Sequence, residues 1–256
     1  MRFDLHCHTA EGSLDGKIPL REYVQLLKEN GFQGMLITDH NSYKAYQHYL
    51  SNSSDPVFQD FTVLKGIEYD TRSCGHFLIV MPRGFSVPLF DVRGLPLRSL
   101  IRLVHEHGGI IGPAHPFGEK FLSFGRSKTF QKHRDIVSQF DFLEGYNCCE
   151  SAEANAEAMD LASEFQIPCF GGSDSHRHDN VGLAYTDFPV SIRTEDDLIR
   201  HVKQKGSMEI GGRHYTGTVK ERIGKWNDFL VYSYFFYNKF TALARYQRRR
   251  EALRRI

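Results

Sequence analysis

Residues 3–40 read FDLHCHTAEGSLDGKIPLREYVQLLKENGFQGMLITDH, and this stretch contains one complete unit of strand, helix and strand. Phe3–Leu5 and Met35–Thr38 are short apolar runs of the kind that form buried strands. Between them, four side chains recur at helical spacing, namely Leu20, Tyr23, Val24 and Leu27. Gly31 follows where a left-handed C-terminal cap is favoured. The stretch therefore predicts a β-α-β unit.

The same alternation continues towards the C-terminus. Five further apolar runs follow, at Phe61–Gly66, Phe77–Met81, Gly109–Gly112, Phe142–Gly145 and Pro168–Gly171. Helical patterns lie near them, at Leu97, Leu100, Ile101 and Val104, at Met159, Ala162 and Phe165, and after the expected N-cap Thr194. Repeated units of this kind predict an α/β protein with a mostly parallel sheet.

Length and composition exclude several classes of protein. A chain of 256 residues with 41% hydrophobic residues can bury a large core, which excludes disorder. The longest apolar stretch, Phe229–Tyr237, is too short to span a membrane, and no secretory signal is recognisable at the N-terminus. Five cysteines without CxxC spacing favour free thiols in a reducing compartment. We therefore expect a cytoplasmic protein.

A domain boundary is predicted near residue 210. Residues 1–210 hold the alternating pattern, residues 211–224 are rich in glycine, and a helix is expected from Lys225 onward. The last twelve residues carry six arginines and one glutamate, which leaves residues 1–244 with a net charge of −4 out of the total of +1.

Histidines and acids stand at the ends of the predicted strands. They are His6 and His8, Asp39 and His40, Glu68, His115, and Asp174 and His176. In a parallel barrel the C-terminal ends of all strands lie on one face, so we expect these side chains to converge there. The period of two in an extended strand also turns His6 and His8 to the same side and Cys7 to the other.

A mixed set of imidazoles and carboxylates of this size exceeds the four ligands of one structural zinc. Such ligands suit Mn, Fe, Zn or Co, and a carboxylate such as Glu68 can bridge two ions. Neighbouring metal ions lower the pKa of a bound water and hold the oxygens of a phosphoryl group. The pattern therefore indicates a multinuclear centre suited to phosphoester hydrolysis.

Several motifs resemble those of the PHP (polymerase and histidinol phosphatase) family of metal-dependent phosphoesterases. They span residues 4–176 in the family's order: DLHCHT at 4–9 with Asp15-Gly16, ITDH at 37–40, GIE at 66–68, Gly75-His76, AHP at 114–116 and GSDSH at 172–176. The resemblance implies a distorted (β/α)7 barrel with a C-terminal helical extension and two or three divalent ions, Mn, Fe or Zn.

The resemblance also implies three groups of ligands. The first group is His6, His8, Glu68 and Asp174; the second is Glu68, His76 and His115; the third is His40, His176 and Asp15. Many relatives have a histidine where this chain has Asp15, and Leu14 is an inserted residue that could displace the carboxylate. His76 precedes its apolar run, which in a parallel barrel would put it on the wrong face; a loop histidine is the alternative.

Other residues are expected to serve catalysis and substrate binding. The expected catalytic residues are Asp39, Asp174 and His176, with Asp39 orienting a ligating imidazole or, alternatively, capping a helix. Arg126 and Arg177 are the candidates for gripping phosphate, although either could be a solvated surface residue.

The resemblance favours a hydrolase acting on phosphoric ester bonds through metal-activated hydroxide. Small phosphomonoesters and nucleotides are the first substrate class, including nucleoside bisphosphates and oligonucleotide 5′ ends. Histidinol phosphate and phosphotyrosine remain open, and a non-catalytic, metal-stabilised binding module is the alternative of another class.

The C-terminal segment allows a further partner. Aromatic residues between Phe229 and Phe240 precede the six arginines, Arg245, Arg248, Arg249, Arg250, Arg254 and Arg255. This pattern could bind nucleic acid or an anionic membrane surface. We favour a helix that packs its aromatic side chains on the barrel and leaves the arginines in solvent.

Overall fold

The first three strands form the unit that residues 3–40 predict. β1 (Arg2–Cys7), β2 (Gly34–Ile37) and β3 (Thr62–Asp70) pair in parallel, and α1 (Leu20–Glu29) connects β1 to β2. α1 buries all four residues of the predicted stripe, and Gly31 has a φ of 79°. The computed structural model describes residues 1–85, 90, 92–118, 122–218, 222, 224 and 226–244.

β4 (His76–Val80) runs antiparallel to both of its neighbours, β3 and β5 (Ile110–Pro113). β4 is thus an exception to the mostly parallel sheet that the sequence predicts. An antiparallel strand starts on the face where its neighbours end, so the N-terminal residue of β4 lies on the same face as the C-terminal ends of β1, β2 and β3. His76 is that residue, and its position before the apolar run therefore places it on the expected face.

A second, two-stranded sheet continues the barrel-like arrangement of strands beyond β5. β6 (Leu143–Asn147) pairs in parallel with β7 (Cys169–Gly172). The amide of Asp174 donates to the carbonyl of His6 at 2.8 Å, which joins the end of β7 to β1, and the amide of Asp141 donates to Ile111 beside β5. The seven predicted runs thus all form strands of one barrel-like α/β fold.

Two further strands were not expected from the sequence. β8 (Ala184–Asp187) pairs antiparallel with β1, and β9 (Glu209–Gly212) pairs antiparallel with β8. They extend the large sheet, whose order is β5-β4-β3-β2-β1-β8-β9. The sheet therefore continues two residues past position 210, and the strand directions differ from a regular sevenfold β-α repeat.

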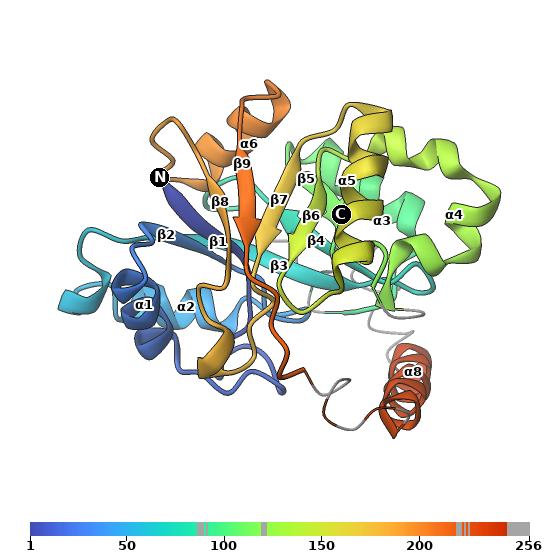
Figure 1. Cartoon of the computed structure of the whole chain (residues 1–256), viewed down its shortest axis with the longest axis horizontal. Coiled ribbons are helices and arrows are strands. Elements are labelled where there is room, and N and C mark those ends of the chain that lie inside the picture. The colour runs from blue at the N-terminus through green and yellow to red at the C-terminus, as the bar shows by residue number, and fades with distance from the viewer. Residues whose placement is uncertain are drawn as a thin grey trace.

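Helices cover both flanks and both ends of the strands. Among the described residues, the remaining α-helices are α2 (Lys44–Ser51), α3 (Leu97–Glu106), α4 (Lys128–Lys132), α5 (Ala152–Phe165), α6 (Glu195–Lys203) and α8 (Trp226–Ala244). α1 and α2 lie on one flank and α3, α4 and α5 on the other, while α6 and α8 lie at opposite ends (Figure 1). None of the described helices has the length and hydropathy of a membrane span.

Two helix predictions have different outcomes. Thr194 caps α6 through a reciprocal capping box with Asp197, as the sequence indicates. The stripe predicted for α5 is wrong at Met159, which is exposed, whereas Ala162 is buried and Phe165 packs against the core as predicted. Ala158 and Leu161 complete the buried face of α5.

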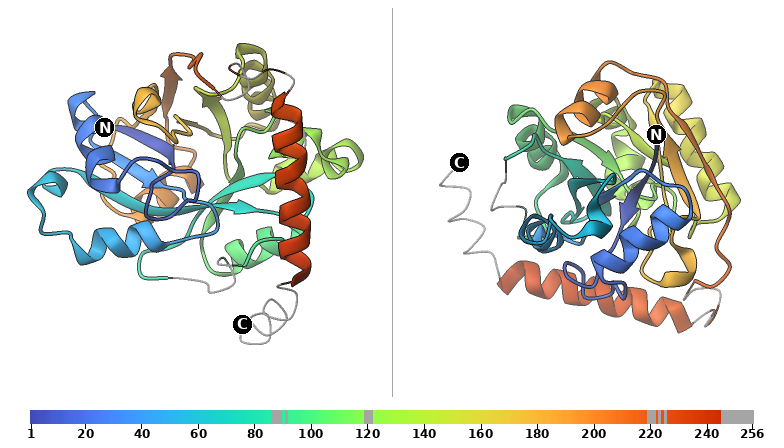
Figure 2. Two further views of the ribbon diagram at one scale, coloured as in Figure 1. Left: turned by 90° about the horizontal axis from the view of Figure 1, so that it is seen from below. Right: turned by 90° about the vertical axis from the view of Figure 1, so that its left-hand side faces the viewer.

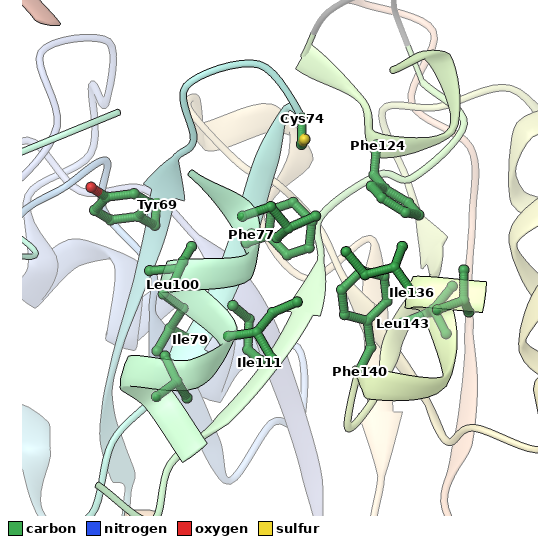
Figure 3. Close-up of a cluster of buried hydrophobic side chains, with 14 of the residues drawn as sticks. Tyr69, Cys74, Phe77, Ile79, Leu100, Ile111, Phe124, Ile136, Phe140 and Leu143 are labelled. Carbon is green, nitrogen blue, oxygen red and sulfur yellow. The ribbon is translucent and has the colours of Figure 1, made fainter. Parts of the chain in front are cut away.

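The apolar core is divided by the strands. One cluster, drawn in Figure 3, joins Phe77, Ile79 and Ile111 to α3 and to aromatic residues such as Phe124 and Phe140. A second cluster fills the barrel from Phe3 and Leu5 and is closed by Leu198 and Val202 of α6; a third lies under α1 and α2. α6 therefore closes one end of the barrel, and the opposite end is left for polar side chains.

Candidate metal centre

A β-bulge in β1 directs two histidines into the open end of the barrel. Before the irregularity between Asp4 and Cys7, Phe3 and Leu5 belong to the interior cluster; after it, Cys7 packs with the residues under α1. His6 and His8 then point together towards the carboxylates of the neighbouring strands. A bulge re-aims side chains in this way next to functional sites, and the predicted sidedness of this His-x-His segment is confirmed.

Glu68 lies at the centre of the polar cluster. Its Oε1 lies 2.9 Å from Nδ1 of His76 and 3.0 Å from Nε2 of His115. Its Oε2 lies 3.4 Å from Nε2 of His6, 3.2 Å from Nε2 of His8 and 3.3 Å from Nδ1 of His40. The two oxygens of one buried carboxylate therefore face two different sets of imidazoles.

Asp174, which follows the C-terminal end of β7, faces His6 and His8, two of the histidines near Glu68. Its Oδ1 lies 3.4 Å from Nε2 of His6 and 3.2 Å from Nε2 of His8, while its Oδ2 accepts a hydrogen bond from Asn147. Asp174 and His115 adopt positive φ angles of 50° and 28°. Left-handed backbone is costly for residues with a Cβ and concentrates at functional sites, where the surrounding fold holds it in place.

Asp15 reaches the cluster despite the inserted Leu14. Its Oδ2 lies 3.4 Å from Nε2 of His176 and 3.7 Å from Nε2 of His40. The insertion therefore does not displace the carboxylate from these imidazoles. Leu14 itself is 92% exposed at the mouth of the cavity above the cluster.

Four groups of donor atoms are close enough to hold a divalent ion. They are His6, His8 and Glu68; Glu68, His76 and His115; His8, Asp15, His40 and His176; and His40, Asp70 and His76. Ligand atoms bound to one ion at about 2.1 Å lie roughly 3.0 to 3.4 Å from one another. Most of the separations given above are of this size, so the residues present fit several ions, and Glu68 belongs to two of the four groups.

Asp70 is a candidate metal ligand that the sequence analysis did not identify. Its Oδ1 lies 3.3 Å from Nδ1 of His40 and 3.4 Å from Nε2 of His76. Both Oδ1 of Asp70 and Nδ1 of His40 are buried without a hydrogen-bond partner among the described residues. Leaving such atoms unpaired costs about 1–3 kcal/mol each, and a shared cation would satisfy both. Asp70 lies two residues after Glu68 on β3, so the period of a strand turns both side chains to the same side, and this spacing could have indicated Asp70 as a ligand.

Glu144 was also missed, because it stands inside an apolar run. Its Oε1 lies 2.8 Å from Nδ1 of His6, and its Oε2 accepts the backbone N–H of His115. Ser13 holds Nδ1 of His8 in the same manner at 3.2 Å. These contacts fix the rings so that Nε2 of each histidine points at Glu68 and Asp174.

The carboxylates and imidazoles of the cluster shift one another's pKa values towards their charged forms. Although burial opposes ionisation, the surrounding imidazoles hold the pKa values of Glu68 and Asp174 well below the usual carboxyl range. In turn, against burial, the carboxylates raise the pKa of His40 and of His115 to about 9. In the absence of metal, protons on the imidazoles therefore balance the acids; bound cations would take over that role.

Asp39 does not have its predicted contact with an imidazole. Its carboxylate accepts the backbone N–H of Thr9 at 2.7 Å and the hydroxyl of Thr9 at 2.9 Å. Asp39 therefore fixes the loop that follows His8, while the contact to the His8 ring comes from Ser13. The structure thus corrects the proposed partner of Asp39.

The two predicted phosphate-binding arginines lie in different places. Arg177 lines the cavity above the cluster, and its Nε lies 3.5 Å from Oδ1 of Asp179. Arg126 is exposed, donates to the carbonyl of Phe117 at 3.2 Å, and is absent from the residues found to line the cavity. Of the two arginines, Arg177 is the one that lines the cavity.

The cavity has a volume of about 750 Å³ and lies between the barrel and the C-terminal segment. His40, Glu68 and His176 contribute to its floor, whereas α8 contributes Asn227, Leu230, Val231 and Tyr234. Figure 2 shows α8 crossing the molecule at the end of the barrel opposite α6. The preferred prediction for this helix is wrong in part, because Phe229, Phe236 and Phe240 are exposed. Arg245–Ile256 lies outside the described residues.

Comparisons with known proteins agree with this architecture. The family model described as PHP-associated matches residues 152–205. A lesion-specific endonuclease Q of Pyrococcus furiosus has a TM-score of 0.62 at 19% identity, over 82% of this chain and 58% of that one. The chain has the PHP fold.

Other similar structures cover more of their own length. The protein PsfC of Pseudomonas syringae has a TM-score of 0.59 at 16% identity, over 91% of this chain and 98% of that one. A Bifidobacterium adolescentis protein assigned as a metal-dependent phosphoesterase also has a TM-score of 0.59, at 14% identity, over 80% of this chain and 96% of its own.

One curated relative is an uncharacterized protein of Methanocaldococcus jannaschii. It is 30% identical over 107 residues, which is 41% of this chain. The match spans 45% of the relative's length, less than half of that protein.

Proposed function

We propose that this chain is a metal-dependent phosphoesterase that hydrolyses small phosphomonoesters or nucleotides. The observation that carries the proposal is the position of Glu68, whose two buried oxygens face two different sets of imidazoles. A bridging carboxylate of this kind is what a centre of several ions needs. The similar phosphoesterase and endonuclease structures support the same class of chemistry.

Two or three divalent ions, Mn, Fe or Zn, would be held by the groups that the family resemblance implies. The first group is His6, His8, Glu68 and Asp174, the second Glu68, His76 and His115, and the third Asp15, His40 and His176; Asp70 adds a donor beside His40 and His76. Bound ions would supply hydroxide at neutral pH and neutralise charge on the phosphoryl oxygens.

The chain's own residues provide orientation and positive charge. Asn147 holds Oδ2 of Asp174, so that Oδ1 stays directed at His6 and His8. Asp39 holds the backbone of Thr9 and thereby the loop that carries Asp15. Arg177, on the cavity wall, is placed to contact equatorial oxygens of a phosphoryl group, which a guanidinium can meet two at a time.

The size of the cavity favours small substrates. A volume of about 750 Å³ is in the range that encloses a nucleotide-sized molecule. An endonuclease Q structure holds a 27-mer duplex with an abasic lesion at the active site. For this chain, an oligonucleotide 5′ end is therefore a second candidate, and histidinol phosphate and phosphotyrosine are further candidates within the same reaction class.

The test is hydrolysis by the full chain loaded with Mn²⁺, Fe²⁺ or Zn²⁺. The substrates are a nucleoside monophosphate, a nucleoside 3′,5′-bisphosphate, histidinol phosphate, a phosphotyrosine peptide and a 5′-phosphorylated oligonucleotide. Asp174→Asn and His8→Ala are each expected to lower turnover by about 10³-fold or more, because the metal-activated hydroxide is lost. Circular dichroism should show that both variants keep the fold.

Two results would overturn the proposal. Hydrolysis that survives both substitutions with unchanged metal content would place the chemistry elsewhere. Stoichiometric metal binding without hydrolysis of any of the five substrates would instead favour a binding module whose metals only stabilise the barrel. The matched control is His105→Ala, which removes a partly exposed histidine of α3 whose ring contacts Asp141 and which belongs to none of the four groups of donor atoms.

A further inference from the structure

The cavity above the cluster has walls of two chemical kinds. Its floor presents carboxylates and imidazoles, including Glu68 and Asp174. Its upper wall presents the apolar side chains Leu230 and Val231 and the ring of Tyr234, all from α8. Leu14 and Leu122 add apolar surface from the barrel side. A ligand bound to the floor through an anionic group would therefore place its remaining part against apolar surface.

Hydrogen bonds hold α8 and the segment before it over the floor of the cavity. The hydroxyl of Tyr234 donates to Oδ2 of Asp70 at 3.3 Å, and Asp70 belongs to the polar cluster itself. The preceding segment is held to the barrel by Tyr215, whose N–H donates to Cys148 and whose hydroxyl donates to Asp179, both at 2.7 Å. The apolar wall is therefore tied to the cluster at a fixed position.

Leu14 provides a second indication of an apolar ligand. It is 92% exposed, directly beside Asp15 in the loop that reaches the cluster. A leucine exposed to water at the mouth of a polar site forgoes the favourable free energy of burying its side chain. A ligand that covers Leu14 would recover part of that free energy. Single exposed leucines are ordinary on protein surfaces, but this one lines the same cavity as Leu230.

We propose that α8, together with Leu14, is the substrate-selecting wall of the site, and that it favours phosphomonoesters with an aromatic or apolar leaving group. This inference rests on the proposed function for the reaction, but the binding preference can be tested without it. A nucleoside has the planar rings that such a wall contacts, whereas glycerol or a sugar exposes mainly hydroxyl groups. α8 crosses the end of the barrel opposite α6 (Figure 2) and lines the cavity, so it would also restrict the approach of a base-paired helix.

Hydrolysis provides the first experiment. The full chain loaded with Mn²⁺ is assayed with p-nitrophenyl phosphate and with glycerol 2-phosphate, and the ratio of the two kcat/KM values is measured. Leu230→Ser and Leu14→Ser are each expected to lower this ratio about tenfold, because one apolar contact changes discrimination by roughly 10- to 200-fold at most. Phe229→Ser is the matched control, since Phe229 precedes Leu230 on α8, is 67% exposed and is absent from the residues lining the cavity.

Binding provides the second experiment and separates this inference from the proposed function. Phenylphosphonate and methylphosphonate are titrated calorimetrically into the same Mn²⁺-loaded proteins, which requires no hydrolysis. Tighter binding of phenylphosphonate, lost about tenfold in Leu230→Ser but kept in Phe229→Ser, supports the wall even if the wild-type chain hydrolyses neither ester. Equal affinities for the two phosphonates in the wild-type chain would overturn it, as would an unchanged preference in Leu230→Ser. If the wild-type chain hydrolyses neither ester while the binding preference holds, only the proposed reaction is overturned.

Discussion

Oε1 of Glu144 lies 2.8 Å from Nδ1 of His6, and both side chains are fully buried. This contact leaves Nε2 of His6 directed at Glu68 and Asp174. A histidine ring held by a carboxylate on one nitrogen presents a more basic second nitrogen to a metal ion. Glu144 therefore acts through His6 as a positioning residue.

Glu144→Gln is expected to weaken metal binding by about 10- to 100-fold, because the amide cannot hold the His6 ring through the same charged contact. The measurement is competition for Mn²⁺ against a chelator of known affinity. Glu157→Gln, a change of the same type on the exposed face of α5, is the control and should bind as the wild type does. Unchanged affinity in Glu144→Gln would show that the ring of His6 is held by its surroundings alone.

Metal affinity is expected to rise with pH. Against the effect of burial, the carboxylates raise the pKa of His40 and of His115 to about 9 in the metal-free cluster. Below that pH each ring carries a proton that an incoming ion must displace, so affinity increases as the pH approaches 9. Calorimetry at pH 7 in buffers of different ionisation enthalpy should detect proton release on binding of Mn²⁺. Binding without proton release would contradict a protonated cluster.

Arg177 and Arg126 are expected to differ in their effect on the substrate. Arg177 lines the cavity, whereas Arg126 is exposed and contacts the Phe117 carbonyl. Arg177→Ala should raise KM for a phosphomonoester by about 10-fold, in line with 1.5–3 kcal/mol for a charge-assisted hydrogen bond reduced by partial exposure. Arg126→Ala, the partner variant, should leave KM within twofold. The reverse order in steady-state kinetics would restore Arg126 as the phosphate-binding residue.

Much of the centre could be predicted because each donor follows a recognisable strand. His6, His8 and Glu68 stand at or near the ends of apolar runs, and a parallel sheet brings such ends together. His76 could be placed only by family resemblance, because no local pattern announces that β4 reverses direction. Strand direction depends on the pairing partners, which are distant in the sequence.

The residues that were missed share a different cause. Glu144 lies within an apolar run and is satisfied by His6, which is 138 positions away. Tyr234 is one aromatic residue among many in α8, and its contact with Asp70 spans 164 positions. The exposed aromatic face of α8 was likewise unpredictable, because the sequence pattern does not reveal which side of the helix meets the barrel. Long-range packing decides such positions.

Gly75 is expected to be intolerant of a side chain, because two constraints coincide there. Its φ is 76°, and a Cβ would lie 2.4 Å from the carbonyl oxygen of Leu122. Gly75→Ala should therefore lower the free energy of unfolding by about 3 kcal/mol or more, the sum of left-handed strain and a backbone clash. It should also shift His76, the next residue, and weaken metal binding.

The matched control is Gly84→Ala, at a glycine with φ of 78° and open space around its Cβ position. This variant carries the left-handed strain alone and should cost about 1–2 kcal/mol. The difference between the two variants, measured by urea denaturation, isolates the close approach of the Leu122 backbone to Gly75. If the two variants unfold at the same urea concentration, that contact does not constrain the start of β4, and the position of His76 must be fixed by its pairing with Asp70.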